Sequence, residues 1–304
     1  MKSKGERWSV RRVTRLGFLT SVGTALFVLE SLIPLPLPFL KIGLANISTL
    51  IALAISGPAD AIIVVFLRVL AGSLITGSFL GPAFVLAMAA GLASAAAMSL
   101  LHGLTGRLFS PVGISLVGSA THVITQLTIV SAVYVHSAAV AQFLPLLLMT
   151  ALLGGLVVAL VTMRLLPVLH SRGAPLDGNE ARFRPRMGAA DTVVLVVIAG
   201  AMVSTFLLAP GETGTSVLVE VDGHTVGKLS LLEDAQLQVH GAKGDLHVEV
   251  LQGRVRIVDA ECPNQICVRT GWRMRQGEVI VCVPNKTVVR ILGENVNTVG
   301  GITG

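Results

Sequence analysis

The chain has 304 residues, of which 53% are hydrophobic and only 13% are charged. Soluble globular proteins carry roughly 25% charged residues, so this composition excludes an ordinary soluble domain and indicates a membrane protein. The formal net charge is +6. Residues 1–210 carry 14 Lys and Arg against 6 Asp and Glu, whereas residues 211–304 carry 9 against 11. The excess positive charge therefore belongs to the membrane half, at helix ends, and no nucleic-acid partner is expected.

The first 210 residues contain seven apolar runs that predict an α-helical polytopic bundle. The run at residues 42–56 is short; we count it as a span because the loop charges then alternate, although a re-entrant or tilted segment fits its length almost as well. Proline is expected at the first helical position of three runs, at Pro58, Pro82 and Pro111. The six runs that are long enough to cross about 30 Å of hydrocarbon lie near residues 14–35, 59–79, 82–102, 111–135, 143–167 and 190–209.

The Lys and Arg residues predict how the chain is oriented. The N-terminal segment 1–15, the loop that holds Arg107 and the segment 172–188 are basic, and basic loops stay in the cytoplasm. About six spans thus return the chain to the cytoplasm, and a seventh, near residues 191–209, carries it out. The N-terminus is expected to be cytoplasmic and the C-terminal part extracytoplasmic.

The periodicity changes after Ser216. Apolar and polar residues alternate on both sides of an Asp-Gly turn, a Gln-Gly turn and a Pro-Asn pair, which is typical of short β-hairpins. A small all-β domain is therefore expected. The predicted layout is a membrane domain at 1–170, a basic cytoplasmic linker at 171–189, a transmembrane anchor at 190–210 and an extracytoplasmic β-domain at 211–304.

Arg68 is the most informative charged residue of the membrane half. It lies about ten residues into an otherwise apolar helix, where a charge costs roughly 2.5–3.5 kcal/mol, so it should face the bundle. A guanidinium fork suits the capture of an anionic head group such as phosphate. The alternative is a structural pair with Glu30 or with helix carbonyls.

Other polar residues of the membrane half are weaker candidates. Glu30 and Lys41 flank a Pro-rich turn and could be interfacial, whereas His122 and Gln126 share one helix face and could form a contact between helices. Asp60 stands near a helix start, where a carboxylate is favourable. The candidate ligand-binding residues are Arg68, Glu30, Lys41, Asn46, His122 and Gln126.

Small residues recur at fourfold spacing on two of the predicted spans. Such stripes let helices approach closely, so they indicate internal packing or, as an alternative, the docking of a partner subunit. The two stripes are Gly17, Ser21 and Ala25, and Gly91, Ala95 and Ser99.

The chain has three cysteines, Cys262, Cys267 and Cys282, all in the predicted β-domain. An extracytoplasmic domain meets an oxidising environment, which favours a disulfide, and Cys262 with Cys267 could form one. Thiol redox or metal chemistry and plain buried thiols remain as alternatives. Because the C-x4-C spacing is not a usual structural zinc spacing and no adjacent His completes a ligand set, no metal site is predicted.

No phosphate-binding loop, dinucleotide-binding turn or Asp-rich prenyl-diphosphate motif occurs in the sequence. This weighs against an enzyme, and no catalytic residue is assigned. No cofactor motif is recognisable either.

The segments "CPNQIC", "TGW" and "VCVPNKTVVRI" resemble the NusG domain II-like family of small β-domains, which usually stand behind one membrane anchor. The resemblance does not imply a role in transcription. The matching positions are Cys262, Pro263, Asn264, Cys267, Thr270, Gly271, Cys282, Pro284 and Asn285.

The membrane half, with "LPFLKIGLANISTLIAL" and "FLRVLAGSLITGSFLGPAFVLAMAAGLAS", resembles the Gx transporter family, often labelled heptaprenyl diphosphate synthase component I. That family is similar to the substrate-binding S components of energy-coupling-factor vitamin transporters. The two resembled families are often encoded near flavin-attaching enzymes and quinone or isoprenoid synthesis, in bacterial loci for flavin-based extracellular electron transfer.

These resemblances imply a multi-pass protein of the bacterial cytoplasmic membrane that binds a small amphipathic or anionic ligand. It would work with other membrane subunits of a transport or flavin/quinone-linked extracellular electron transfer assembly, with flavin or quinone association possible. The alternative that the family label implies is an accessory subunit of heptaprenyl diphosphate synthesis for quinones. That subunit would need a catalytic partner.

Overall fold

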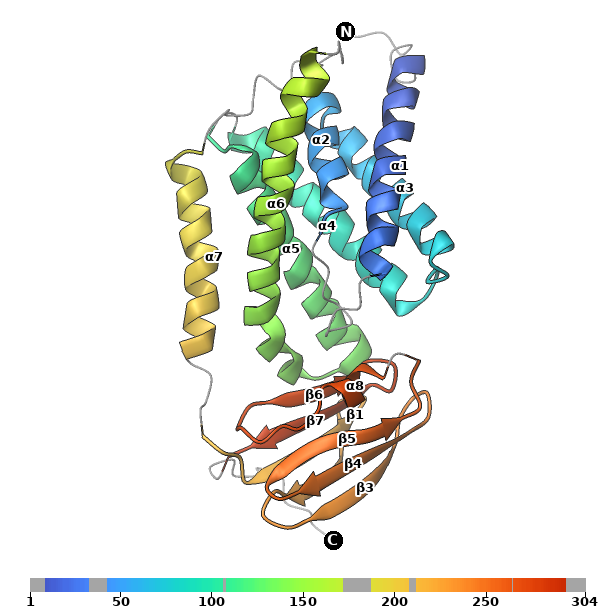
Figure 1. Cartoon of the computed structure of the whole chain (residues 1–304), viewed down its shortest axis with the longest axis vertical. Helices are drawn as coiled ribbons and strands as arrows, with labels where there is room; N and C mark the ends of the chain where they lie inside the picture. The colour runs from blue at the N-terminus through green and yellow to red at the C-terminus, as the bar shows by residue number, and fades with distance from the viewer. Residues whose placement is uncertain are drawn as a thin grey trace. The chain divides into compact units, whose positions relative to one another are not determined.

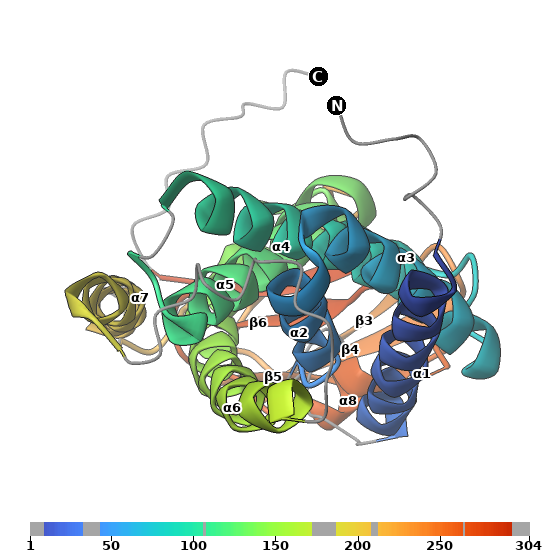
Figure 2. The same ribbon diagram turned by 90° about the horizontal axis from the view of Figure 1, so that it is seen from above.

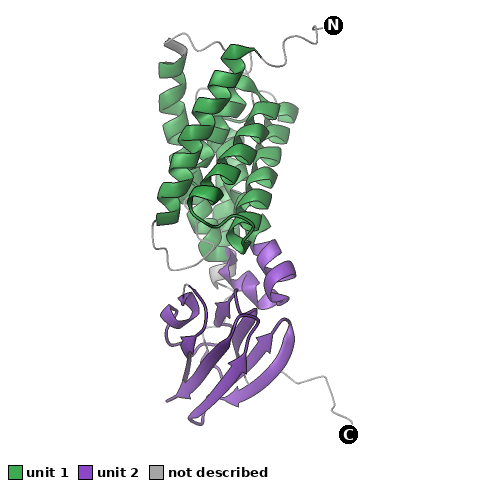
Figure 3. Ribbon diagram, turned by 90° about the vertical axis from the view of Figure 1, so that its right-hand side faces the viewer, with its two compact units in different colours: residues 1–35, 39–126, 145–203 green, residues 36–38, 127–144, 204–304 purple. Residues whose placement is uncertain are grey.

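The computed structural model describes residues 9–32, 43–105, 108–171, 187–207, 212–263 and 265–293. Helices occupy the first two thirds of the chain and antiparallel strands the last third (Figure 1). The chain forms two compact units (Figure 3). Unit 1 comprises residues 1–35, 39–126 and 145–203, and unit 2 comprises residues 36–38, 127–144 and 204–304. The predicted helical membrane bundle with a small all-β C-terminal domain is confirmed.

Three of the long apolar helices begin at the prolines that the sequence analysis expected at helix starts. Pro58, Pro82 and Pro111 each stand at the first position of a helix, where the missing N–H group costs no hydrogen bond. Within the residues that the structure describes, five helical segments are long and apolar enough to cross a membrane. The helices are α1 (Val10–Leu32), α2 (Asn46–Ser56), α3 (Pro58–Ile75), α4 (Pro82–Thr105), α5 (Pro111–Ile129), α6 (Leu144–Ser171) and α7 (Ala189–Leu207).

Helix α2 is too short to cross a membrane by itself. Its 11 residues rise about 16 Å, roughly half the thickness of the hydrocarbon layer. Every residue from Asn46 to Ile55 is buried, and the view from above shows α2 surrounded by longer helices of the bundle (Figure 2). The predicted run at 42–56 therefore contains a half-length helix in the bundle interior. Residues 33–42, which precede it, lie outside the described residues.

Helices α1 and α2 run in opposite directions, and hydrogen bonds at both ends fix this. At one end, a carboxylate oxygen of Glu30 accepts a hydrogen bond from the backbone N–H of Leu44. At the other end, Nη1 of Arg15 donates to the carbonyl oxygen of Ile55 at 3.4 Å. The N-terminus of α2 therefore lies near the C-terminal end of α1.

An ion pair joins the start of α1 to the start of α3. Nε of Arg12 donates to Oδ1 of Asp60 at 2.9 Å, and Nη2 of the same guanidinium contacts the same oxygen. Asp60 is buried, at 2% exposure. The carboxylate was expected to favour the helix dipole, and it also neutralises a basic residue of the N-terminal segment.

The two stripes of small residues differ in their surroundings. Gly91 and Ala95 are buried in α4, and a Cβ at Gly91 would lie 2.9 Å from Cγ1 of Val65. In contrast, Gly17, Ser21 and Ala25 are exposed on α1. The stripe on α4 thus packs against α3, whereas the stripe on α1 does not pack inside the protein.

The strands of unit 2 form two antiparallel sheets with one shared core. One sheet has the order β2-β1-β7-β6 and the other the order β3-β4-β5, and apolar side chains of both sheets belong to a single buried cluster. The strands are β1 (Ser216–Val221), β2 (His224–Ser230), β3 (Ala235–His240), β4 (Asp245–Leu251), β5 (Arg254–Ala260), β6 (Val279–Cys282) and β7 (Thr287–Leu292), with the one-turn helix α8 (Ile266–Arg269) after β5.

The hairpin turns carry the residues that the sequence indicated. Asp222 and Gly223 both have positive φ, of 51° and 80°, and Gln252 and Gly253 have φ of 50° and 74°. Two successive residues with positive φ make the tight turn that matches the twist of the flanking strands. The hairpins β1-β2, β4-β5 and β6-β7 were predicted, whereas β3 and α8 were not.

Unit 2 also includes the π-helix η2 (Val130–Val135) and the 3-10 helix η3 (Ala138–Phe143), which connect α5 to α6. Nδ1 of His136 lies 2.7 Å from Oδ1 of Asp222. The hydroxyl of Ser137 donates to Oε2 of Glu220 at 2.8 Å. The predicted outer loop of the membrane domain thus contacts the first β-hairpin through its side chains.

Candidate functional site

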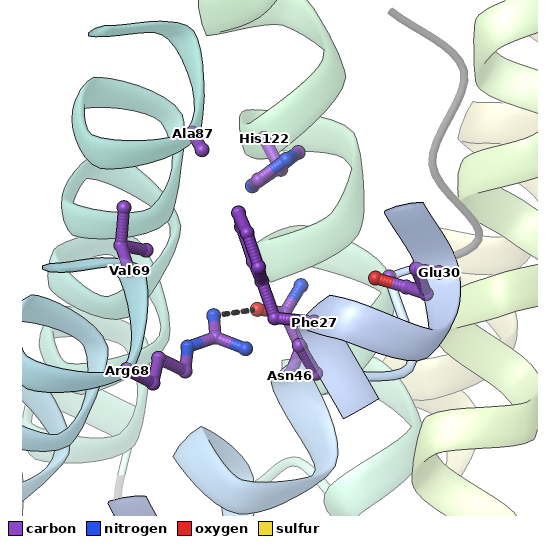
Figure 4. Close-up of a pocket in the computed structure, with 9 residues that line it drawn as sticks. Phe27, Glu30, Asn46, Arg68, Val69, Ala87 and His122 are labelled. Atoms are coloured by element: carbon purple, nitrogen blue, oxygen red, sulfur yellow. Dashed lines mark hydrogen bonds between the residues drawn. The ribbon is translucent and has the colours of Figure 1, made fainter. Parts of the chain in front are cut away.

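Arg68 lies in the middle of α3 and is buried, at 3% exposure. Its Nη2 donates to Oδ1 of Asn46, the first residue of α2, at 2.7 Å (Figure 4). Nε and Nη1 of the same guanidinium have no hydrogen-bond partner among the described residues. Buried donors without acceptors are costly. Arg68 therefore has donors available for a further group.

These side chains line a small, partly open cavity inside unit 1 of about 20 Å³, which is room for about one water molecule. Four of the predicted ligand-binding residues, from α1, α2, α3 and α5, come together around it. The ring of Phe27 stands between Arg68 and His122 (Figure 4). The lining residues are Phe27, Glu30, Gly43, Ala45, Asn46, Arg68, Val69, Ala87 and His122.

The N-terminus of α2 adds a second positive feature to this cavity. No side chain caps the helix at Ala45, and the N–H groups of Asn46 and Ile47 donate to the carbonyl oxygens of Gly43 and Leu44; the helix dipole still places a partial positive charge at this end. Glu30 balances part of this charge through its hydrogen bond to Leu44. The cavity thus combines a guanidinium, a helix N-terminus and a carboxylate with apolar walls from Phe27 and Val69.

Two of the predicted candidates are not among the lining residues. Lys41 lies outside the described residues. Gln126 is buried one turn beyond His122 on α5, at 3% exposure, and its Oε1 has no hydrogen-bond partner within the described ranges. Phe27, in contrast, was missed by the sequence analysis because an apolar residue in an apolar helix carries no signal.

Close contacts around the cavity depend on two glycines. A Cβ at Gly23 of α1 would overlap the hydroxyl of Ser48 and lie 3.0 Å from Cδ of Arg68. A Cβ at Gly72 of α3 would overlap the ring of Phe27. The glycines therefore leave the space that the guanidinium and the aromatic ring occupy.

Asp191, at the start of α7, caps another helix of unit 1. Its Oδ1 accepts hydrogen bonds from the N–H groups of Ser110 and Gly113, both at 3.0 Å, and its Oδ2 accepts one from Gly188 at 2.7 Å. A carboxylate that satisfies free N–H groups at a helix N-terminus is stabilising. The predicted anchor is thus bonded to the first turn of α5. The sequence analysis missed this contact, because its partners are 81 and 78 residues apart.

The second group of predicted site residues lies in unit 2. The sulfur atoms of Cys262, Cys267 and Cys282 all lie within 4.8 Å of one another, with 3.9 Å between Cys262 and Cys267. We call these three residues the thiol cluster. None of them forms a disulfide in the structure. The strand pairing of β6 brings Cys282 to the other two.

The three thiols differ in their tendency to lose a proton. A hydrogen bond from Cys267, followed by one from the backbone N–H of Asn285, lowers the pKa of Cys282 to about 6. The shared hydrogen bond with Cys282 and then burial raise the pKa of Cys267. Burial raises the pKa of Cys262. The hydrogen bonds within the cluster therefore favour the thiolate form of Cys282.

The helices with their buried polar cavity and the antiparallel β-domain define a multi-span membrane protein with an appended small domain. Residues 19–165 match the family model described as heptaprenyl diphosphate synthase component I. Residues 192–295 match the family model described as NusG domain II. The chain is a fusion of domains of these two families, as the sequence resemblance suggested. The comparison with curated proteins found no match.

Solved structures match about a quarter of the chain. A DUF1312 family protein from Ruminococcus gnavus ATCC 29149 is 33% identical over 26% of this chain and 97% of its own, with a TM-score of 0.24. The Lin0431 protein from Listeria innocua is 26% identical over 26% of this chain and 95% of its own, with a TM-score of 0.25.

Proposed function

We propose that the protein is a membrane subunit that binds a small amphipathic anion in the cavity of unit 1, within a small-molecule transport or flavin/quinone-linked extracellular electron transfer assembly. The coarser part of this function, a membrane-associated role, follows from the apolar helices and the family of residues 19–165. The resemblance to the Gx transporter family supports the transport part.

The observation that carries the proposal is the guanidinium of Arg68. It is buried in the bundle and two of its nitrogens lack acceptors among the described residues. Oxygen atoms of a phosphate or carboxylate would supply those acceptors and neutralise the charge. The apolar walls formed by Phe27, Val69 and Ala87 would cover the apolar part of the ligand.

The test compares wild type with Arg68→Ala and Arg68→Lys in gentle detergent. Small molecules that copurify with the full chain are identified by mass spectrometry. We expect an anionic amphiphile in the wild type that falls at least about tenfold in Arg68→Ala, since one charge-assisted contact is worth about 1.5–3 kcal/mol. Arg68→Lys should retain part of it, because lysine keeps the charge without the fork.

The matched control is Arg164→Ala, which removes an exposed arginine of α6 and should leave the ligand in place. Equal amounts of every copurifying molecule in all four proteins would contradict the site. Expression and thermal unfolding of each variant distinguish loss of the ligand from loss of the fold.

A second candidate function follows from the family description of residues 19–165, heptaprenyl diphosphate synthase component I. The chain would then be an accessory subunit of polyprenyl diphosphate synthesis, and the diphosphate would contact Arg68. Proteins that copurify from gentle detergent discriminate the two functions. Flavin or quinone enzymes support the first, whereas a prenyl synthase supports the second.

A further inference from the structure

The thiol cluster is assembled by three different elements of unit 2. Cys262 follows β5, Cys267 lies in α8, and Cys282 ends β6. Cys267 and Cys282 are 1% and 2% exposed, whereas Cys262 is partly exposed. Three sulfur atoms are therefore held together in the core, with one of them reachable from the surface.

Backbone N–H groups lie near two of the sulfur atoms. The N–H of Gln265 favours the thiolate form of Cys262, and the N–H of Asn285 favours that of Cys282. In both cases the N–H group lies three residues after the cysteine, in a turn that contains a proline. Such groups stabilise a thiolate more than a neutral thiol or a disulfide.

The side chain of Asn285 adds to this pattern. It is fully buried, and its Oδ1 accepts a hydrogen bond from the N–H of Lys243 at 2.8 Å. Its Nδ2 makes no well-aligned hydrogen bond to any described residue, although the side chain lies next to the sulfur of Cys282. A negatively charged sulfur at this place would give that amide an acceptor.

The spacing of the sulfurs is compatible with three thiolates around one metal ion. A disulfide needs the two sulfurs at about 2.05 Å. Three thiolates around one ion, each at about 2.3 Å, are about 3.8–4.0 Å apart. Cys262 and Cys267 are 3.9 Å apart, and the other distances lie within 4.8 Å.

We propose that the thiol cluster binds one soft metal ion through three thiolates, and that Cu(I) is the ion whose preference it matches. Thiolates select soft ions such as Cu(I) and Zn(II). Structural zinc takes four protein ligands, whereas the described residues gather only these three cysteines as metal ligands here. Each thiol that binds the ion releases one proton, and no electron transfer is required.

The experiment uses the full chain in detergent, purified without a histidine tag, reduced, and kept under argon. Cu(I) is added in competition with a chromogenic Cu(I) chelator, and the thiols are then alkylated and counted by mass. We expect one Cu(I) per chain and protection of all three thiols. Cys267→Ser should weaken binding at least about 100-fold, because loss of a ligand exceeds the effect of its outer partners.

Two controls keep this result specific. His240→Asn removes an exposed histidine of the same domain and should leave the affinity unchanged. Thiol protection in the wild type needs no variant, so misfolding of Cys267→Ser does not decide the outcome. No competition for Cu(I), binding of Zn(II) but not Cu(I), or equal Cu(I) binding by Cys267→Ser would each overturn the proposal.

Discussion

At the scale of single residues, the cavity of unit 1 depends on side chains that are absent as much as on those that are present. Gly72 of α3 has no side chain, and the ring of Phe27 fills that space. The ring in turn separates Arg68 from His122 (Figure 4). The position of Phe27 therefore decides how much room the guanidinium leaves for a ligand.

Gly72→Ala should push the ring of Phe27 out of its place, because the added Cβ overlaps it. We expect a loss of about 1–3 kcal/mol in the free energy of unfolding, the usual effect of overpacking, together with altered ligand copurification. Thermal unfolding in detergent measures the first effect. Gly17→Ala is the matched control, since a Cβ there meets no atom within 4 Å, and it should be neutral or stabilising by up to about 1 kcal/mol. Equal unfolding temperatures of the two variants would argue against a filled space at Gly72.

At the scale of elements, the sequence predicted the helix starts and hairpin turns, because single residues determine them locally. Prolines marked the starts of α3, α4 and α5, and the Asp222-Gly223 pair marked the first hairpin, because these residues restrict φ or allow its positive values. The half length of α2 follows instead from the helices that surround it. The cap that Asp191 provides could not be predicted either, because its partners are distant in sequence.

For the candidate sites, too, the sequence predicted local features but not those that depend on tertiary contacts, as the cysteines and Arg68 illustrate. A charge in an apolar helix pointed to Arg68 directly, and the cluster of cysteines in one β-domain pointed to thiol chemistry. The thiol cluster itself depends on the pairing of β6 with β7, which places Cys282 opposite Thr287. Sequence spacing therefore gave no metal site, because a short linear pattern does not contain this third ligand.

Asp191→Ala should loosen the contact between α7 and α5. Three backbone N–H groups lose their acceptor, and we expect about 1–3 kcal/mol of lost stability, measured by thermal unfolding of the full chain. Thr192→Ala changes the adjacent exposed residue and should stay within about 0.5 kcal/mol of the wild type. If Asp191→Ala and Thr192→Ala unfold at the same temperature, the carboxylate of Asp191 does not stabilise the contact between α7 and α5.

At the scale of the whole molecule, contacts within unit 2 bear on the side of the membrane on which the β-domain lies. The Lys and Arg pattern predicts that the loop between α5 and α6 and the β-domain both lie outside the cytoplasm. Within unit 2, residues of that loop are hydrogen-bonded to the first hairpin, through Ser137 and Glu220. Two segments that touch must share one side of the membrane, so the contact agrees with the charge rule.

Single reporter cysteines test this orientation in intact cells. Glu233→Cys lies in the exposed β2-β3 connection, and Leu104→Cys lies near the end of α4 at 77% exposure, next to the predicted cytoplasmic loop. We expect a membrane-impermeant maleimide to label Glu233→Cys at once and Leu104→Cys only after the membrane is breached. The wild-type chain gives the baseline, to which Cys262 contributes because it is partly exposed, whereas Cys267 and Cys282 are buried; labelling of each variant is counted above that baseline. The reverse labelling pattern would place the β-domain in the cytoplasm.

The cap on α5 has a consequence for the order in which the protein is made. Ser110 precedes Asp191 by 81 residues, so α5 is synthesised and enters the membrane long before the carboxylate that completes its first turn. A chain that stops before the seventh helix lacks the acceptor for two N–H groups at a buried helix end, those of Ser110 and Gly113. The start of α5 therefore gets its final hydrogen-bond acceptor only when the seventh helix has been made.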